Sequence, residues 1–128
     1  MKLQKTPFSA APYMERAKEI LSKMTLTEKI GQLNLTGTVR SLDENMIREG
    51  KVGNFLNVPD VATANRRQKI AVEESRMGIP LLIGHDVVHG DRTLFPIPLA
   101  TAASWDMERI EKCEMLAAKE AGADVYVV

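Results

Sequence analysis

Short apolar runs alternate with helix-like segments along most of this chain, and that alternation limits the possible folds more than any other feature. We expect strands at residues 32–35, 52–58, 81–83 and 125–128. The spacing of apolar residues predicts helices at 12–24, 25–30, 41–50, 61–76 and 104–121. Strands that alternate with helices predict an α/β fold with a parallel sheet and right-handed crossovers.

Residues that favour helix ends support these boundaries. Side chains that can cap a helix N-terminus stand before four of the segments: Thr25 or Thr27, Ser41 in a capping box with Glu44, Asp60, and Ser104 or Asp106. Gly78 and Gly122 follow two of the helical patterns, and glycine commonly ends a helix. The small apolar segment at 99–103 is suited to tight packing under a loop.

The most chemically reactive group of residues follows the strand at 81–83. Leu81, Leu82 and Ile83 form a continuous apolar run, which is typical of a strand buried on both faces. The chain then becomes abruptly polar, with Gly84, His85, Asp86, His89, Gly90, Asp91 and Arg92. Because ligands in α/β folds bind at the carboxyl ends of the strands, we expect the functional site in this loop.

Composition argues against several classes of partner. Lys plus Arg equals Asp plus Glu at 17 each, so no bulk charge favours nucleic acid or an anionic membrane. No apolar run approaches the roughly 20 residues that span a bilayer. The first residues lack the apolar core of a secretory signal, and a single cysteine cannot form an internal disulfide. We therefore expect a cytoplasmic protein, or a periplasmic or secreted one if a leader has been removed.

Several stretches together resemble the N-terminal domain of glycoside hydrolase family 3, the family of β-glucosidases and β-xylosidases. They include a G-x-D-x-x-H-G motif that begins at Gly84, and they occur in the family's order. The matching residues are 24–32, 50–57, 79–90, 92–99 and 103–106.

The resemblance implies a fold class and an activity. The implied fold is the N-terminal half of a (β/α)8 TIM-like barrel, formed here by residues 12–128 after an arm at 1–11, with about 250 residues in a whole barrel. The implied activity is retaining hydrolysis of terminal β-D-glycosyl residues in β-glucosides or β-xylosides, without cofactor or metal. The family's nucleophile and acid/base are expected beyond Val128, so we expect the isolated chain to be inactive and to associate through exposed strand edges.

The resemblance assigns Asp86 to the sugar, because the aspartate of the family motif binds hydroxyls of the sugar at the cleavage subsite. An ionised carboxylate can accept two strong hydrogen bonds from adjacent hydroxyls. The alternative for Asp86 is a loop aspartate that only makes a turn. The alternative for the whole domain is a non-catalytic sugar-binding or interaction module.

Other residues near the motif have structural alternatives. His85 and His89 are four apart, as in metal-binding helices, but they lie in a loop, so hydrogen bonds that shape the loop are expected. Arg92 either neutralises Asp86 or Asp91 or contacts the sugar. Later in the chain, Trp105 is either a packing anchor or a surface for sugar stacking, and Cys113 is expected in the core.

Overall fold

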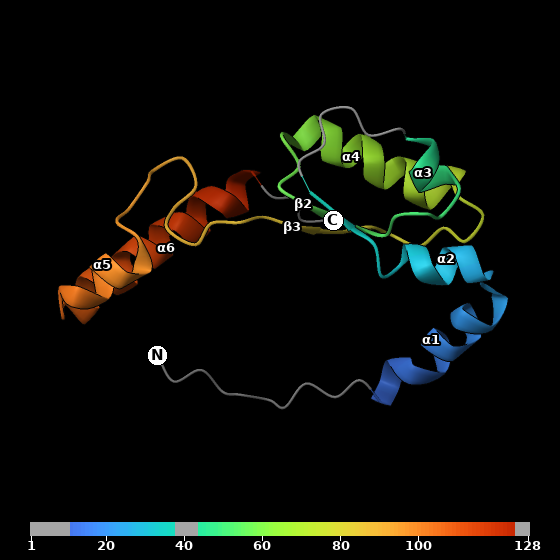
Figure 1. Ribbon diagram of the computed structural model, residues 1–128, viewed down its shortest axis with the longest axis horizontal. Helices are drawn as coiled ribbons and strands as arrows, with labels where there is room; N and C mark the ends of the chain where they lie inside the picture. Colours follow the sequence, from blue (N-terminus) through green and yellow to red (C-terminus); the bar gives the residue numbers. More distant parts are fainter. Residues whose placement is uncertain (1–10, 38–43, 125–128) are drawn as a thin grey trace.

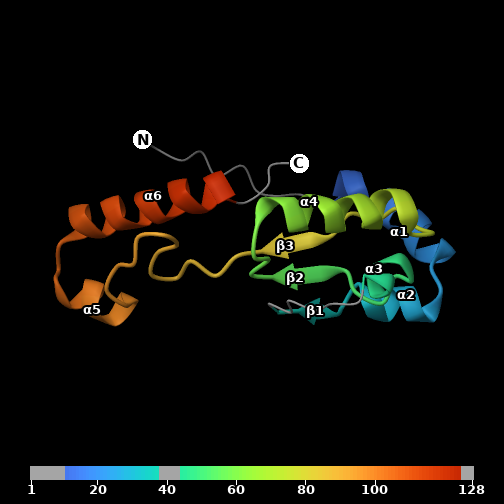
Figure 2. The ribbon, with the colours of Figure 1, turned by 90° about the horizontal axis from the view of Figure 1, so that it is seen from above.

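The computed structural model describes residues 11–37 and 44–124, and its centre is a three-stranded parallel sheet. The strands are β1 (Leu35–Thr36), β2 (Asn54–Leu56) and β3 (Leu82–Gly84), in the order β1-β2-β3. Each is joined to the next by a helical crossover, so the α/β class and the parallel pairing are confirmed. In Figure 2 the strands lie side by side in this order.

Helices lie at both ends of the sheet and over it. They are α1 (Ala11–Lys23), α2 (Leu26–Gly31), α3 (Asn45–Arg48), α4 (Val61–Lys69) with its π-helical continuation η1 (Ile70–Glu74), α5 (Pro98–Ala103) and α6 (Met107–Asp124). Figure 1 shows α3 and α4 on one side of the sheet. In Figure 2 the strands point toward α5 and α6, and α1 to α3 lie near their amino ends. None of the helices in these described ranges is both long and apolar enough to cross a bilayer.

The hydrophobic core fills the space between the sheet and the α4–η1 segment. Phe55 at the middle of β2 is 1% exposed, and Arg67 of α4 stacks over its ring at 4.9 Å. Phe55 is paired with Thr36 and Ile83 on the neighbouring strands. The buried cluster consists of Ile47, Val52, Phe55, Val58, Ala64, Ile70, Ala71 and Leu81.

The opposite face of the sheet is open, which corrects the prediction that the third strand is buried on both faces. Leu35, Asn54 and Leu82 are in register across the three strands, and Leu82 is 71% exposed. Side chains alternate between the two faces of a strand, so Leu81 and Ile83 face the core while Leu82 faces away. No element of the described ranges covers that second face.

Several predicted boundaries shift. The predicted strand at 32–35 begins at Leu35, because Leu33 and Asn34 donate backbone hydrogen bonds that extend the end of α2. The 52–58 strand shortens to Asn54–Leu56, and the helix at 41–50 shortens to Asn45–Arg48, with Ser41 outside the described residues. The helix predicted to reach residue 76 leaves α-geometry at Ile70.

In the C-terminal part, the structure departs from the predictions more in packing than in secondary structure. Asp106 starts α6, with Oδ1 accepting the backbone N–H of Arg109 at 3.0 Å, but the helix passes Gly122. The small apolar segment predicted to pack tightly is α5, and none of its residues is buried. A short helix surrounded by solvent has no layer to pack under. The predicted strand at 125–128 and most of the arm at 1–11 lie outside the described residues.

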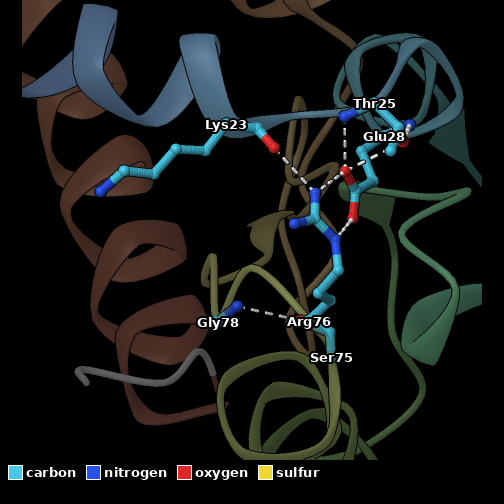
Figure 3. Close-up of polar contacts among 6 residues, drawn as sticks. All are labelled: Lys23, Thr25, Glu28, Ser75, Arg76 and Gly78. Carbon is cyan, nitrogen blue, oxygen red and sulfur yellow. Dashed lines mark hydrogen bonds and ion pairs between the residues drawn. The ribbon is translucent and has the colours of Figure 1, made fainter.

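A partly buried ion pair ties the first two helices to the chain just before β3 (Figure 3). Arg76 donates to Glu28 Oε1 at 2.9 Å and to the carbonyl of Lys23 at 2.9 Å. Thr25 and Glu28 form a capping box at the start of α2, which confirms the cap predicted there. Hydrogen bonds from Arg76 and from the Thr25 backbone lower the pKa of Glu28 to about 2.

Candidate functional site

The polar loop predicted to carry the site lies at the carboxyl ends of β2 and β3. Asn57 follows β2 directly, and His85 and Asp86 follow β3. These residues line a hollow of about 320 Å³ together with His89 and Asp91. The parallel strands bring residues 57 and 85–91 together because their carboxyl ends meet at one edge.

Asp86 is exposed at this edge, and its main chain is fixed. Its backbone N–H donates to Asn57 Oδ1 at 2.7 Å. Its own Oδ1 accepts the backbone N–H of Val88 at 3.3 Å, which is the hydrogen bond of an Asx turn. The carboxylate therefore makes the turn that was the structural alternative, and it also faces a solvent-filled hollow where hydroxyl groups could reach it.

Asn57 is the residue of this site that sequence reasoning missed. Its φ of 57° is in the left-handed region, which residues other than glycine rarely adopt. Its backbone N–H donates to the carbonyl of Gly84 at 2.9 Å, which completes the last parallel pair, Leu56 and Gly84. The only signal in the sequence was an asparagine at a strand end, since asparagine tolerates this conformation better than most residues.

His85 is paired with Asp91 across the loop. His85 Nε2 lies 2.9 Å from Asp91 Oδ1, and the two side chains are 26% and 14% exposed. Asp91 Oδ2 and His89 Nδ1 are buried without a hydrogen-bond partner among the described residues. His85 and Asp91 also line a larger hollow, of about 530 Å³, whose other wall is the start of α4.

The rest of the loop is anchored to α6. Gly90 has a φ of 116°, and a Cβ there would overlap the carbonyl of Thr93. Thr93 donates to Glu120 from its backbone N–H at 2.8 Å and from its hydroxyl at 2.6 Å. These bonds lower the pKa of Glu120, and the backbone and charge of Arg92 contribute in the same direction. The loop is thus held at both ends, by β3 and by α6.

The predicted site residues do not all lie in one place. Asp86, His85 and His89 line the smaller hollow, whereas Arg92 lines the larger one and lies near Glu120. No group of three or more His, Cys, Asp or Glu side chains in residues 11–37 and 44–124 is placed to hold a metal ion. The roles assigned to these four residues stay predictions.

Two residues outside the loop, Trp105 and Cys113, are less buried than predicted. Trp105 is 91% exposed with a φ of 54°, so its interpretation as a packing anchor is wrong. The turn between α5 and α6 holds it outside any layer of packed side chains. Cys113 on α6 is partly buried and forms no disulfide.

Known proteins similar to this chain agree on one family. Residues 25–125 match the family model described as the Glycosyl hydrolase family 3 N terminal domain. The chain is 36% identical over 110 residues to the "Periplasmic beta-glucosidase" of Salmonella typhimurium, a match that covers 83% of this chain and 14% of the relative.

Solved structures give the same result. The beta-glucosidase from Listeria innocua in complex with isofagomine matches with a TM-score of 0.71 and 32% identity, over 86% of this chain and 16% of that one. A mutant of the Listeria innocua beta-glucosidase in complex with laminaribiose matches with a TM-score of 0.69 and 31% identity, over 86% of this chain and 17% of that one. The 128 residues thus span about one sixth of the length of these relatives.

Proposed function

Since this chain belongs to glycosyl hydrolase family 3, we propose that it supplies the sugar-binding part of a retaining β-glycosidase. The proposed substrates are β-glucosides or β-xylosides, cleaved at the terminal non-reducing residue. In this proposal Asp86 holds hydroxyls of the sugar, while His85, His89 and Arg92 shape the loop around it. Residues 12–128 form the first part of the barrel domain.

The position of Asp86 carries the proposal. It lies at the carboxyl end of a parallel strand, where (β/α) barrels place their active sites. Its main chain is bonded to the neighbouring strand end, and its carboxylate lines an open hollow. A carboxylate held in this way can accept hydrogen bonds from two adjacent sugar hydroxyls.

Hydrolysis with retention needs two carboxyl groups about 5–5.5 Å apart, one as nucleophile and one as acid/base. The other carboxylate of the smaller hollow, Asp91, is 14% exposed and paired with His85, so it does not suit an open nucleophile. We propose that both catalytic carboxylates come from the remaining five sixths of the glycosidase. By itself the chain should bind sugar without cleaving it.

The first experiment measures glucose binding to the 128-residue chain by NMR titration, for the wild type and for Asp86→Asn. The amide keeps the shape of the side chain but loses the charge, and hydrogen bonds to charged groups contribute roughly 1.5–3 kcal/mol. Affinity should therefore fall about tenfold or more. Asp106→Asn is the matched control, because Asp106 caps α6 and lines neither hollow.

Equal affinity for the wild type and Asp86→Asn would contradict the role of Asp86. Incubating the same chain with an aryl β-glucoside should give no turnover above buffer. Clear turnover would show that both catalytic carboxylates lie within these residues.

The alternative is a non-catalytic sugar-binding module, which the absence of a second open carboxylate at the described site favours. A chimera separates the two functions, with residues 25–125 replacing the matching segment of the Listeria innocua enzyme. Retained hydrolysis supports the catalytic role. A folded chimera that binds sugar without hydrolysing it supports the module.

The proposal includes a location and a partner. We propose the cytoplasm, or the periplasm or the cell exterior where the whole protein carries a leader; the periplasm is the compartment in the name of the Salmonella typhimurium relative. Fractionation of cells that express the whole gene tests this choice. We also propose that the isolated chain associates with itself, because the sheet formed by the described residues has an exposed apolar face and two edge strands without a further partner there.

A further inference from the structure

We propose that Asn57 is a positioning residue, which sets the place of Asp86 by a side-chain hydrogen bond between the ends of β2 and β3. The inference rests on the proposed sugar-binding role of Asp86 for its functional meaning. Its structural part stands on the geometry of residues 57 and 84–86 alone.

Two hydrogen bonds from one residue hold the end of β3. The backbone N–H of Asn57 donates to the carbonyl of Gly84 at 2.9 Å, and Asn57 Oδ1 accepts the backbone N–H of Asp86 at 2.7 Å. The ladder of the sheet ends with the pair Leu56 and Gly84. The backbone bond of Asn57 completes this last pair, and its side-chain bond extends the connection one residue further, to Asp86.

The left-handed backbone at Asn57 has a reason in this arrangement. Its φ of 57° turns the chain out of β2 while the side chain stays beside Asp86. Glycine would adopt this φ easily but has no acceptor. Alanine has neither the acceptor nor the tolerance, and aspartate would place a second negative charge beside Asp86. Asparagine supplies both requirements without a charge.

The same residues suggest why the position of Asp86 matters. The carboxylate of Asp86 is on an exposed loop and accepts the Val88 N–H at 3.3 Å, whereas the bond from Asn57 holds the Asp86 main chain. Without the bond from Asn57, the Asp86 main chain would lose its connection to the end of β2 and move more freely. Binding would then require the loop to be ordered again, and that ordering has an entropy cost.

The test uses two variants of Asn57 in the 128-residue chain and measures amide hydrogen exchange at Asp86 without ligand. Asn57→Gly keeps the backbone conformation and removes the acceptor, so exchange should be roughly threefold to tenfold faster, as expected for one lost hydrogen bond. Asn57→Asp restores an acceptor, so exchange should be slower than in Asn57→Gly and no faster than in the wild type. Circular dichroism checks that both variants are folded.

Glucose affinity is the functional readout. Asn57→Gly should bind glucose roughly threefold to tenfold more weakly than the wild type, with Asp86 itself unchanged. The control is Asn34→Gly, which removes a side-chain bond of 3.0 Å to the carbonyl of Lys51 near the amino end of the sheet. The control should change neither the Asp86 amide nor the affinity.

The outcomes separate this inference from the proposed function. Unchanged Asp86 exchange in Asn57→Gly overturns the positioning role, whatever the affinity shows. Faster exchange with unchanged affinity overturns the link between position and binding. Faster exchange in Asn57→Gly, together with an Asp86→Asn variant that still binds normally, supports the structural part and removes the proposed sugar contact.

Discussion

Glu28 and Glu19 show how differently two carboxylates with similar pKa values act at the scale of single residues. Hydrogen bonds from Arg76 lower the pKa of Glu28 to about 2, and bonds from Lys23 do the same for Glu19. The Glu28 side chain is 10% exposed, whereas that of Glu19 is 48% exposed. Solvent screens the exposed pairs on α1 more strongly than the Glu28 pair, whose partner Arg76 is 55% exposed, so the Glu28 pair is expected to stabilise the fold more.

We predict that Glu28→Gln lowers the free energy of unfolding at pH 7 by roughly 0.5–1.5 kcal/mol, because it weakens charge-assisted bonds to the half-exposed Arg76 and to the Thr25 backbone. Glu19→Gln is the control and should leave the unfolding curve unchanged. Urea denaturation of the three proteins measures the difference. Equal unfolding curves for Glu28→Gln and the wild type would show that the ion pair of Glu28 and Arg76 does not stabilise the fold.

The same pair predicts a pH dependence. The folded pKa of Glu28 is about 2 and its ordinary value is 4.5, so protons bind the unfolded chain first as the pH falls. The stabilisation is complete above about pH 4.5 and is lost between there and pH 2. The gap between the wild type and Glu28→Gln should therefore narrow over this window, as measured by repeating the denaturation at several pH values.

At the scale of elements, we predict opposite effects on stability for alanine substitutions of two glycines in helices. A Cβ on Gly31 of α2 would overlap the carbonyl oxygen of Gly50 and lie 2.8 Å from its carbonyl carbon, whereas one on Gly122 of α6 meets no atom within 4 Å. Gly31→Ala should cost about 1–3 kcal/mol, because α2 must move away from the turn before β2. Gly122→Ala should stabilise by about 0.5–1 kcal/mol, because alanine is the better helix former.

Thermal unfolding followed by far-UV circular dichroism compares these variants. The midpoint should fall for Gly31→Ala and rise slightly for Gly122→Ala. If Gly31→Ala unfolds like the wild type, α2 does not pack against that turn as closely as the structure indicates.

The elements also show which features a sequence can predict. Thr25 and Asp60 cap their helices through bonds to residues three positions away, so local pattern was sufficient. Asn57 and Asp86 are 29 residues apart, and the pair of His85 and Asp91 depends on how the loop folds back. Such contacts follow from strand register and loop conformation, which the order of residues does not state. The exposure of Leu82 was not predicted, because an apolar run in the sequence does not show whether one or both faces of the sheet are covered.

At the scale of the whole molecule, the uncovered sheet face is expected to control association. Leu35 and Leu82 are 59% and 71% exposed on that face, at the same register of the two outer strands. We predict that the chain associates as its concentration rises, and that Leu82→Lys shifts it toward monomer because a charge resists burial. Sedimentation velocity over a range of concentrations measures this.

Leu26→Lys is the matched control, since Leu26 is 73% exposed on α2, away from the sheet. If both variants change association equally, contacts elsewhere than the open face hold the copies together. A strictly monomeric wild type at all concentrations would remove the basis for the proposed self-association.

The bonds between Thr93 and Glu120 have a mechanical consequence. They fasten the loop that bears Asp86 to a helix 27 residues further along the chain. A displacement of α6 would therefore shift this loop, and a ligand that displaces Asp86 would shift α6 through the same bonds. A polypeptide that binds α6 would thereby change the position of Asp86 at the end of β3.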